Sequence, residues 1–288
     1  MDSSNPSKYS IEFFPPRTQV GEAKLDTVHA ELSKLNPDFF SVTYGAGGST
    51  KSGTQQMVLR YQAAGSHCAP HLSFGGSNEE ELRQILQVYI DAGIKRLVAL
   101  RGDMPSGVGA AVQHSYANEL VKFIRAETGD HFHIDVACYP EIHPESNSYA
   151  SDVNFFKDKV DAGANSAITQ YFYNPDAYFR FVDYCQAAGI DIPIVPGIMP
   201  ITNYANLARF SASCGAQIPR WLNKRLTGFG DDKESLRRFG IDVVTELCED
   251  LLQGGAPGLH FYSMNLSQAV TQIWTNLDLG NRPQRELL

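Results

Sequence analysis

Residues 67–100 read HCAPHLSFGGSNEEELRQILQVYIDAGIKRLVAL and contain one complete strand–helix–strand unit. The short apolar segments 67–74 and 95–100 predict buried strands, and the stretch 78–92 between them has the apolar spacing of a helix. Asn78 and the three glutamates that follow it are typical of a helix start, and Gly93 follows the last helical residue. Two strands that are joined by a helix in this way lie parallel in one sheet.

The same unit repeats along the chain, with strand starts at intervals of roughly 30 residues. Further strands are expected at 8–14, 38–44, 132–139, 165–171, 192–198 and 258–263, and further helices at 148–162 and 175–188. Eight such units predict a (β/α)8 barrel of the TIM type. The long interval from 198 to 258 predicts extra helices between strands 7 and 8, near 202–213 and 231–253. A doubly wound sheet is the alternative, but Pro15 and Pro16 follow the first strand where that fold would carry a glycine-rich loop.

The composition is that of an ordinary globular protein of 288 residues with a net charge of −8. No run of Lys or Arg occurs, so we expect neither nucleic acid nor a membrane as partner. The five cysteines form no CxxC pair and the histidines show no HxH or HExxH spacing, so we expect reduced thiols and no metal site. The polar N-terminus lacks a signal-peptide pattern, and we expect a cytoplasmic protein. We expect one catalytic domain over 1–288, with flexible tails at 1–7 and 281–288.

Polar side chains gather at the carboxyl ends of the expected strands, where the active sites of barrel enzymes lie. Glu12 lies within the apolar first strand, and burial of its carboxyl would raise its pKa and suit a general acid. A carboxylate paired with a neighbouring backbone group or Arg is the equal alternative. Arg101, Gly102 and Asp103 follow the fourth strand and offer either a ligand contact or a local ion pair.

Four further segments have a weaker signal. Prolines flank a loop after the fifth strand that presents Tyr139, Glu141 and His143, and Gln170 at the end of the sixth strand could pair with the edge of a heterocycle. The glycine-rich loop at 45–50 could bind phosphate. His71 in the third strand is more typical of a hydrogen-bonded core histidine. The residues alone therefore predict a barrel enzyme for a polar, partly aromatic ligand and do not name its reaction.

Several of these segments resemble the signature blocks of the methylenetetrahydrofolate reductase family, in its compact bacterial form. They occur in the family's order from about residue 9 to 278: 11–16 (IEFFPP), 41–48 (SVTYGAGG), 99–103 (ALRGD), 139–144 (YPEIHP), 169–170 (TQ) and 196–198 (PGI). The resemblance implies a flavoprotein that uses FAD, with NADH or NADPH as reductant, in a ping-pong hydride transfer. It implies the reduction of 5,10-methylenetetrahydrofolate to 5-methyltetrahydrofolate, for one-carbon metabolism and methionine supply. We also expect a homo-oligomer.

The resemblance also assigns roles to individual residues. Glu12 matches the general acid that opens the folate ring, and Asp103 matches a carboxylate beside the flavin. Gln170 matches a pterin contact, and Phe210 matches an aromatic that stacks on nicotinamide or folate. The FAD contacts map onto Thr43, His71, Leu100, Arg101, Gly102, Asp103, Tyr116, Ala117, Ala137, Tyr139, His143, Asp152 and Lys159. Among them Arg101, His143 and Lys159 would offset the charge of the diphosphate.

Three positions depart from the family pattern. Asn206 replaces a Gln near Phe210, Leu266 replaces an Arg after the last strand, and Phe155 replaces an Asn among the FAD contacts. These changes bear on the affinity for the reductant and the folate tail more than on hydride transfer. Two other functions stay open on the residues alone: a barrel enzyme that acts on a phosphorylated ligand without flavin, and a catalytically silent barrel subunit of an electron-transfer complex.

Overall fold

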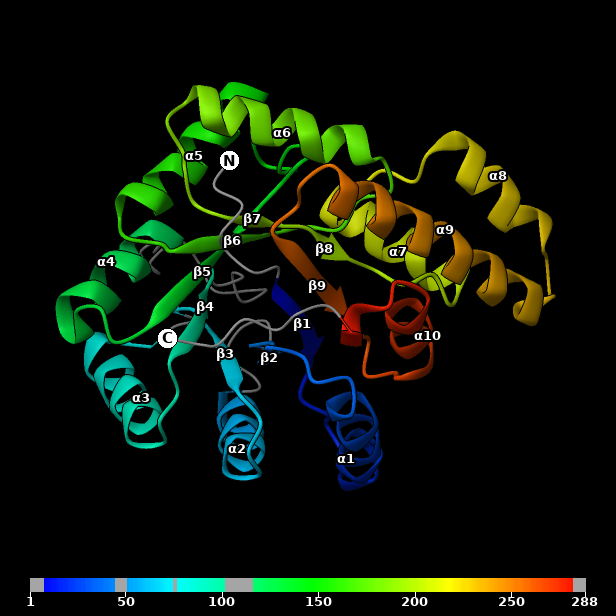
Figure 1. Cartoon of the computed structure of the whole chain (residues 1–288). Helices are drawn as coiled ribbons and strands as arrows, with labels where there is room; N and C mark the ends of the chain where they lie inside the picture. Colours follow the sequence, from blue (N-terminus) through cyan, green and yellow to red (C-terminus); the bar gives the residue numbers. More distant parts are fainter. Residues whose placement is uncertain (1–7, 45–50, 75–76, 102–115, 282–288) are drawn as a thin grey trace, which may run out of the picture.

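The computed structural model describes residues 8–44, 51–74, 77–101 and 116–281. Its strands form one parallel sheet in the order β7-β6-β5-β4-β3-β2-β1-β9-β8, surrounded by helices (Figure 1). The strands are β1 (Lys8–Phe13), β2 (Phe39–Val42), β3 (Cys68–Leu72), β4 (Arg96–Ala99), β5 (His133–Cys138), β6 (Ser166–Thr169), β7 (Ile194–Val195), β8 (Gly197–Ile198) and β9 (Gly258–Tyr262).

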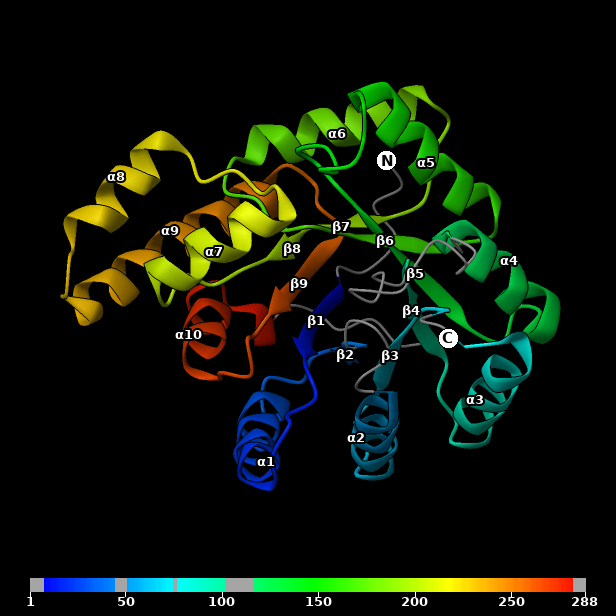
Figure 2. The same ribbon diagram turned by 180° about the vertical axis from the view of Figure 1, so that it is seen from behind.

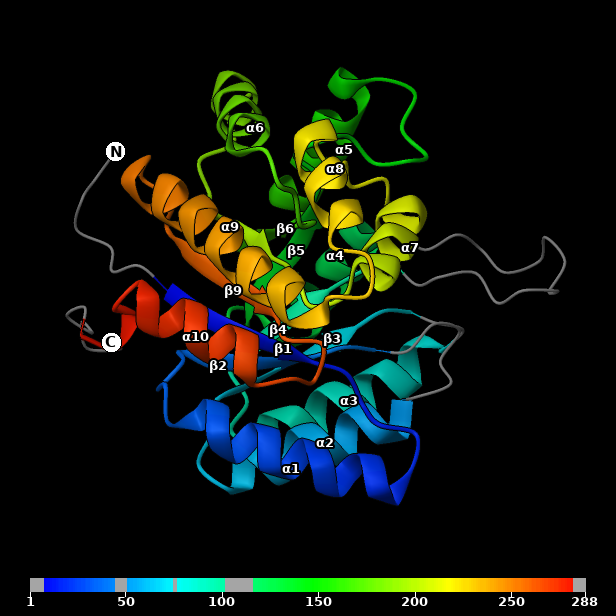
Figure 3. The ribbon, with the colours of Figure 1, turned by 90° about the vertical axis from the view of Figure 1, so that its right-hand side faces the viewer.

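Ten α-helices are present in the described residues, and most of them return the chain from one strand to the next. They are α1 (Gln19–Ser33), α2 (Lys51–Ala63), α3 (Glu79–Asp91), α4 (Ala117–Thr128), α5 (Tyr149–Asp161), α6 (Pro175–Ala187), α7 (Tyr204–Cys214), α8 (Arg220–Gly228), α9 (Lys233–Gln253) and α10 (Gln268–Asn276). Figure 2 shows the same ring of helices from behind, and in Figure 3 α7, α8 and α9 lie together on the side of the sheet opposite α1, α2 and α3.

Pro196 divides the segment that closes the barrel into two short strands, β7 and β8. β7 pairs with β6, whereas β8 pairs with β9, so one continuous segment joins the two ends of the sheet. Proline has no backbone N–H to give to the ladder. Its carbonyl still accepts from the N–H of His260 at 3.0 Å, and Gly197 N–H turns to the hydroxyl of Thr169 at 2.9 Å. The sheet therefore closes into a barrel, as the sequence predicts, with its expected seventh strand split in two.

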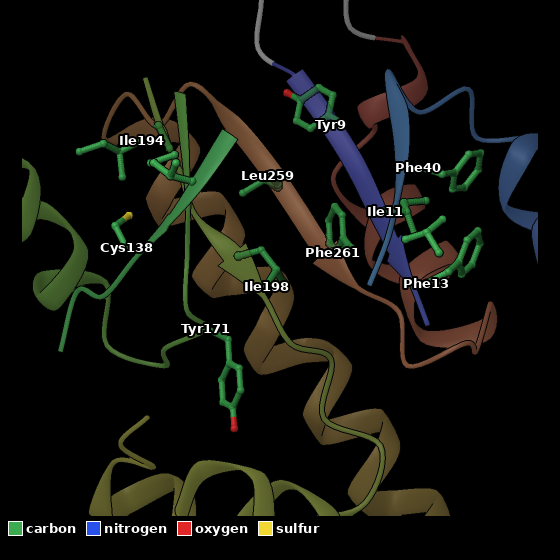
Figure 4. Close-up of a cluster of buried hydrophobic side chains, with 14 of the residues drawn as sticks. Tyr9, Ile11, Phe13, Phe40, Cys138, Tyr171, Ile194, Ile198, Leu259 and Phe261 are labelled. Atoms are coloured by element: carbon green, nitrogen blue, oxygen red, sulfur yellow. The ribbon is translucent and has the colours of Figure 1, made fainter. Parts of the chain in front are cut away.

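Strand alternation separates an outer core from the barrel interior. On β1, Tyr9, Ile11 and Phe13 are buried in the large core between sheet and helices, part of which Figure 4 shows. Ser10 and Glu12 occupy the alternate positions. Apolar residues of β2, β3, β4 and β6 form a smaller cluster that consists of Phe39, Ala69, Val98 and Ile168, with Leu100 and Tyr262 packed against it.

A buried ion pair lies next to this smaller cluster, at the amino ends of the strands. Arg96 at the start of β4 binds both carboxylate oxygens of Asp135, at 2.6 and 2.8 Å, and its guanidinium lies 4.2 Å from the ring centre of Phe39. Burial opposes the charge of Asp135, but Arg96 outweighs it and holds the pKa of the carboxyl below its usual value. The pair fills one end of the barrel and leaves the carboxyl ends of the strands for a ligand.

The architecture predicted from the sequence is confirmed, including the extra helices between the last two strand units, which are α7, α8 and α9. Asn281, which the sequence assigns to a tail, instead closes a short 3-10 helix (Leu279–Asn281), while 1–7 and 282–288 lie outside the described residues. No helix in the described ranges has the length and apolar character to cross a membrane.

Candidate active site

A hollow opens where the strands end, with about 360 Å³ of space not occupied by protein atoms. Six of the predicted site residues line it: Glu12, His71, Leu100, Ala137, Tyr139 and Gln170. Val98, Ile168 and Tyr262 complete the wall. The hollow is thus apolar on the side of β4 and β6 and polar around Glu12.

Two histidines face the carboxylate of Glu12. Its Oε2 lies 3.3 Å from Nε2 of His71 and 3.5 Å from Nε2 of His260. His260 is fully buried, and its other ring nitrogen, Nδ1, lies 2.7 Å from the hydroxyl of Ser10. The carboxylate therefore lies between two rings, one of which is fixed in orientation by a neighbouring strand.

The structure corrects the expected direction of the Glu12 pKa. Burial raises this pKa, as the sequence suggests, but the interactions with His260 and His71 are together stronger and lower it from 4.5 to about 2. The side chain is 17% exposed, so little water screens these interactions. The predicted rise was wrong because the two histidines come from strands that are distant in sequence from Glu12. With this lowered pKa, the carboxyl of Glu12 is ionised at neutral pH.

Tyr262 closes the side of the hollow next to Gln170. Its hydroxyl donates to the carbonyl of Thr169 at 2.7 Å, directly before Gln170. The Tyr262 ring can take this position only because residue 197 is a glycine: a Cβ at Gly197 would lie 2.2 Å from the Thr169 carbonyl oxygen and 2.6 Å from the Tyr262 ring. Gln170 is held as well, since its side-chain oxygen accepts from Tyr171 N–H at 3.0 Å.

A second group of predicted residues lies beside the hollow, around the end of β5. Lys159 donates to the carbonyl of Ala137 at 2.6 Å, and burial lowers the pKa of its ammonium group. The buried Asp152 accepts from the backbone N–H of His143 at 2.9 Å, and the His143 ring lies edge-on to Tyr139. No described carboxylate lies within ion-pair distance of Lys159 Nζ, although the charge of Asp152 acts on this group and opposes the effect of burial on its pKa.

Arg101 has a partner that the sequence did not predict. Its guanidinium pairs with Glu145 at 2.7 Å, at the edge of the mouth, where both side chains are well exposed. Glu145 raises the pKa of the guanidinium. Arg101 is thus ion-paired with a residue of the loop after β5; the expected pair within its own turn involves Asp103, which lies outside the described residues.

The remaining predicted residues that the structure describes do not line the hollow. Thr43 follows β2 and donates its N–H to the carbonyl of Phe13, while Tyr116 and Ala117 form the start of α4. Phe210 and Asn206 lie on α7, where Phe210 is half-buried and Asn206 is exposed. Gly102, Asp103 and the glycine-rich loop at 45–50 lie outside the described residues.

Sequence reasoning missed His260, Tyr262, Val98 and Ile168. The signal for the first two was present, because in the strand GLHFY the residues Leu259 and Phe261 form one face and His260 and Tyr262 the other. The register places His260 beside Ser10 and Tyr262 beside Glu12. Alternation in the last strand, combined with the barrel, would have brought both residues to the site.

Comparison with known proteins decides the family. A family model described as methylenetetrahydrofolate reductase matches residues 2–278. The chain is 40% identical over 275 residues to the 5,10-methylenetetrahydrofolate reductase of Pectobacterium carotovorum subsp. carotovorum, a match that covers 95% of this chain and 90% of the relative. The protein of that name from Escherichia coli (strain K12) is also 40% identical, with 95% and 91% covered.

This chain belongs to the methylenetetrahydrofolate reductase family. A plant relative, methylenetetrahydrofolate reductase (NADH) 1 of Arabidopsis thaliana, is 38% identical over 285 residues, which cover 94% of this chain and 48% of the relative. Among solved structures, a protein of Clostridium thermocellum that binds two copies of 5-methyl-5,6,7,8-tetrahydrofolic acid has the same fold, with a TM-score of 0.65 and 18% identity over 96% of this chain and 95% of that one. The family resemblance drawn from the sequence is therefore confirmed.

Proposed function

We propose that this reductase-family protein converts 5,10-methylenetetrahydrofolate to 5-methyltetrahydrofolate, with NADH or NADPH as reductant and FAD as cofactor. In the overall reaction, one hydride and one proton are added to the substrate and NAD(P)⁺ is released. The position of Glu12 carries the proposal: a carboxylate between two histidines, at the mouth of a barrel of this family, opposite the amide of Gln170.

The residues around the hollow fit a flavin in their chemistry. The apolar wall of Leu100, Val98 and Ile168 suits a planar ring, and the half-buried Lys159, without a carboxylate partner in the described ranges, suits a diphosphate. We assign FAD to this face, with Ala137, Tyr139 and His143 beside it. When bound, FAD would accept hydride from the nicotinamide and give it to the opened folate in the second half of a ping-pong cycle.

Glu12 would deliver the proton that opens the folate ring, because the departing ring nitrogen must be protonated as its bond to the methylene carbon breaks. Glu12 holds no proton at neutral pH in the ligand-free site, so the proton has to reach Oε2 from a neighbour. The rings of His260 and His71 are within ion-pair distance of that atom. Bound folate would displace water from the hollow and thereby favour the neutral carboxyl.

Three further assignments belong to the same proposal. Gln170 would pair with the edge of the pterin, as its amide can donate and accept at once. Phe210 on α7 would stack on nicotinamide or folate in turn, with Asn206 one turn earlier. Asp103 would place a negative charge near the flavin and favour release of the hydride; this role comes from the family resemblance.

The test is a pair of anaerobic half-reactions, followed by flavin absorbance in the stopped flow. Purified protein reconstituted with FAD should be bleached by NADH or NADPH and regain its colour with methylenetetrahydrofolate. A protein that does not bind FAD would favour the barrel enzyme without flavin. A protein that binds FAD but completes neither half-reaction would favour the silent subunit.

A further inference from the structure

The loop between β5 and α5 is held in an unusual backbone conformation. Ile142 has a φ of 75°, in the left-handed region that a β-branched residue rarely adopts. The residues on either side of Ile142 point to different places: the His143 ring lies against Tyr139, while the carboxylate of Glu141 contacts Gln217. The proposed reaction gives no role to Glu141.

The carboxylate of Glu141 binds the segment that joins α7 to α8. Its Oε2 accepts from the backbone N–H of Gln217 at 2.7 Å, and the side chain is half-buried. A second contact reinforces the first. Gly215, which ends α7 with a φ of 76°, lies so close to the loop that a Cβ there would be 2.9 Å from the ring of Pro144. The loop after β5 and the end of α7 are therefore packed together.

The end of β6 holds the same part of α7. The hydroxyl of Tyr171 lies 3.0 Å from that of Ser211 and accepts from the Cys214 thiol at 3.5 Å. Tyr171 directly follows Gln170. The segment directly after α7 is thus tied to the loop after β5 through Glu141, and the second half of α7 is tied to the end of β6 through Tyr171. Tyr139 and Gln170 lie at the ends of the same two strands.

We propose that Glu141 is a positioning residue, which fixes α7 relative to the hollow so that Phe210 can meet the substrates at the correct depth. The inference rests on the proposed function, in which Phe210 contacts nicotinamide and folate. It assigns Glu141 to substrate affinity and not to flavin affinity. The loop keeps its own support without Glu141, because Asp152 binds His143 N–H and the Tyr149 hydroxyl donates to the carbonyl of Pro140.

The test compares Glu141→Ala with Glu141→Gln in the FAD-loaded protein. The amide of Gln keeps an acceptor for the Gln217 N–H, whereas Ala removes it. A bond of this kind is charge-assisted, and its loss from Glu141→Ala should raise the KM for methylenetetrahydrofolate about tenfold. We expect kcat and the Kd for FAD to stay within about twofold, since no bond to either reacting group is lost. Glu141→Gln should recover most of the affinity.

Hydrogen exchange supplies a readout that does not need activity. The Gln217 amide should exchange at least about tenfold faster in Glu141→Ala than in the wild type, and near the wild-type rate in Glu141→Gln. Asp232→Ala is the matched control, because Asp232 also binds a backbone N–H, that of Ser235 at 3.0 Å, at the start of α9. It should leave the KM and the Gln217 amide unchanged.

Three outcomes would overturn the inference: an unchanged KM in Glu141→Ala, an equal loss of FAD affinity, or an unchanged Gln217 amide. If Glu141→Ala does not fold, Gln217→Pro removes the same hydrogen bond from the donor side and should give the same rise in KM. A wild-type protein that neither binds FAD nor turns over would refute the proposed function instead, and the exchange measurement would still decide whether the Glu141 contact forms.

Discussion

Replacement of His260 by Gln should raise the pKa of Glu12, because the hydrogen bond from this ring is the largest single interaction that lowers it. The lowering from 4.5 to about 2 in the wild type corresponds to about 3 kcal/mol in favour of the charged form. Burial works in the opposite direction and stays in the variant. We therefore expect the pKa of Glu12 to be higher by roughly 1 to 2 pH units in His260→Gln than in the wild type.

The assay is carbon NMR of protein labelled at the glutamate carboxyl groups, titrated between about pH 7 and the acid limit of folding. The signal of Glu12 is the one that is missing from Glu12→Gln. An equal pKa of Glu12 in His260→Gln and in the wild type would refute the role of His260, and a wild-type value above 4.5 would refute the ionised site altogether.

The same shift makes a prediction for stability. The pKa of Glu12 is lower in the folded than in the unfolded chain, so its stabilising effect is present above about pH 4.5 and declines as the pH falls toward 2. From the two pKa values, the stability advantage of the wild type over Glu12→Gln should shrink by about 1 kcal/mol between about pH 5 and about pH 3.5. Urea unfolding at the two pH values measures it, and an advantage that grows on acidification would contradict the assigned direction.

Two further changes test the surroundings of the hollow. Lys159→Met should weaken FAD binding at least about tenfold, because the cation that would bind the diphosphate is lost. Fluorescence titration measures the FAD affinity, and Lys157→Met, at a lysine of α5 that pairs with Asp161, is the control. Equal FAD affinities of Lys159→Met and the wild type would remove Lys159 from the site. Gly197→Ala should cost about 1–3 kcal/mol of stability and displace Tyr262, since the new Cβ overlaps the Thr169 carbonyl and the tyrosine ring. Gly228→Ala has open space around the new Cβ and should be tolerated; equal melting temperatures for the two alanine variants would show that Gly197 is not sterically required.

The barrel was predictable because each of its units carries a local signal. Asn78 accepts from the N–H of Glu81 at the start of α3, as the cap pattern predicts, and Ser148 does the same for Ser151 at the start of α5. The apolar residues around Glu12 likewise indicated that its carboxyl lies in a strand of the barrel. These properties depend on neighbours in the sequence, and they need no knowledge of the tertiary structure.

The electrostatics of the site were not predictable in the same way. The charge of Glu12 depends on His71 from β3 and His260 from β9, and the pairing of Arg101 depends on Glu145 from the loop after β5. The register that brings these groups together is a property of the closed barrel. Residue types at the strand ends could indicate a site, but the direction of a pKa shift required the distances.

We propose that Glu12 protonates the folate and takes no part in the reduction of the flavin. Stopped-flow absorbance of Glu12→Gln, loaded with FAD, tests it in the two half-reactions separately. We expect NADH or NADPH to reduce the flavin of this variant at nearly the wild-type rate, while oxidation by methylenetetrahydrofolate falls by at least about a hundredfold. Equal losses in both half-reactions would contradict it and would make Glu12 a structural residue of the barrel mouth.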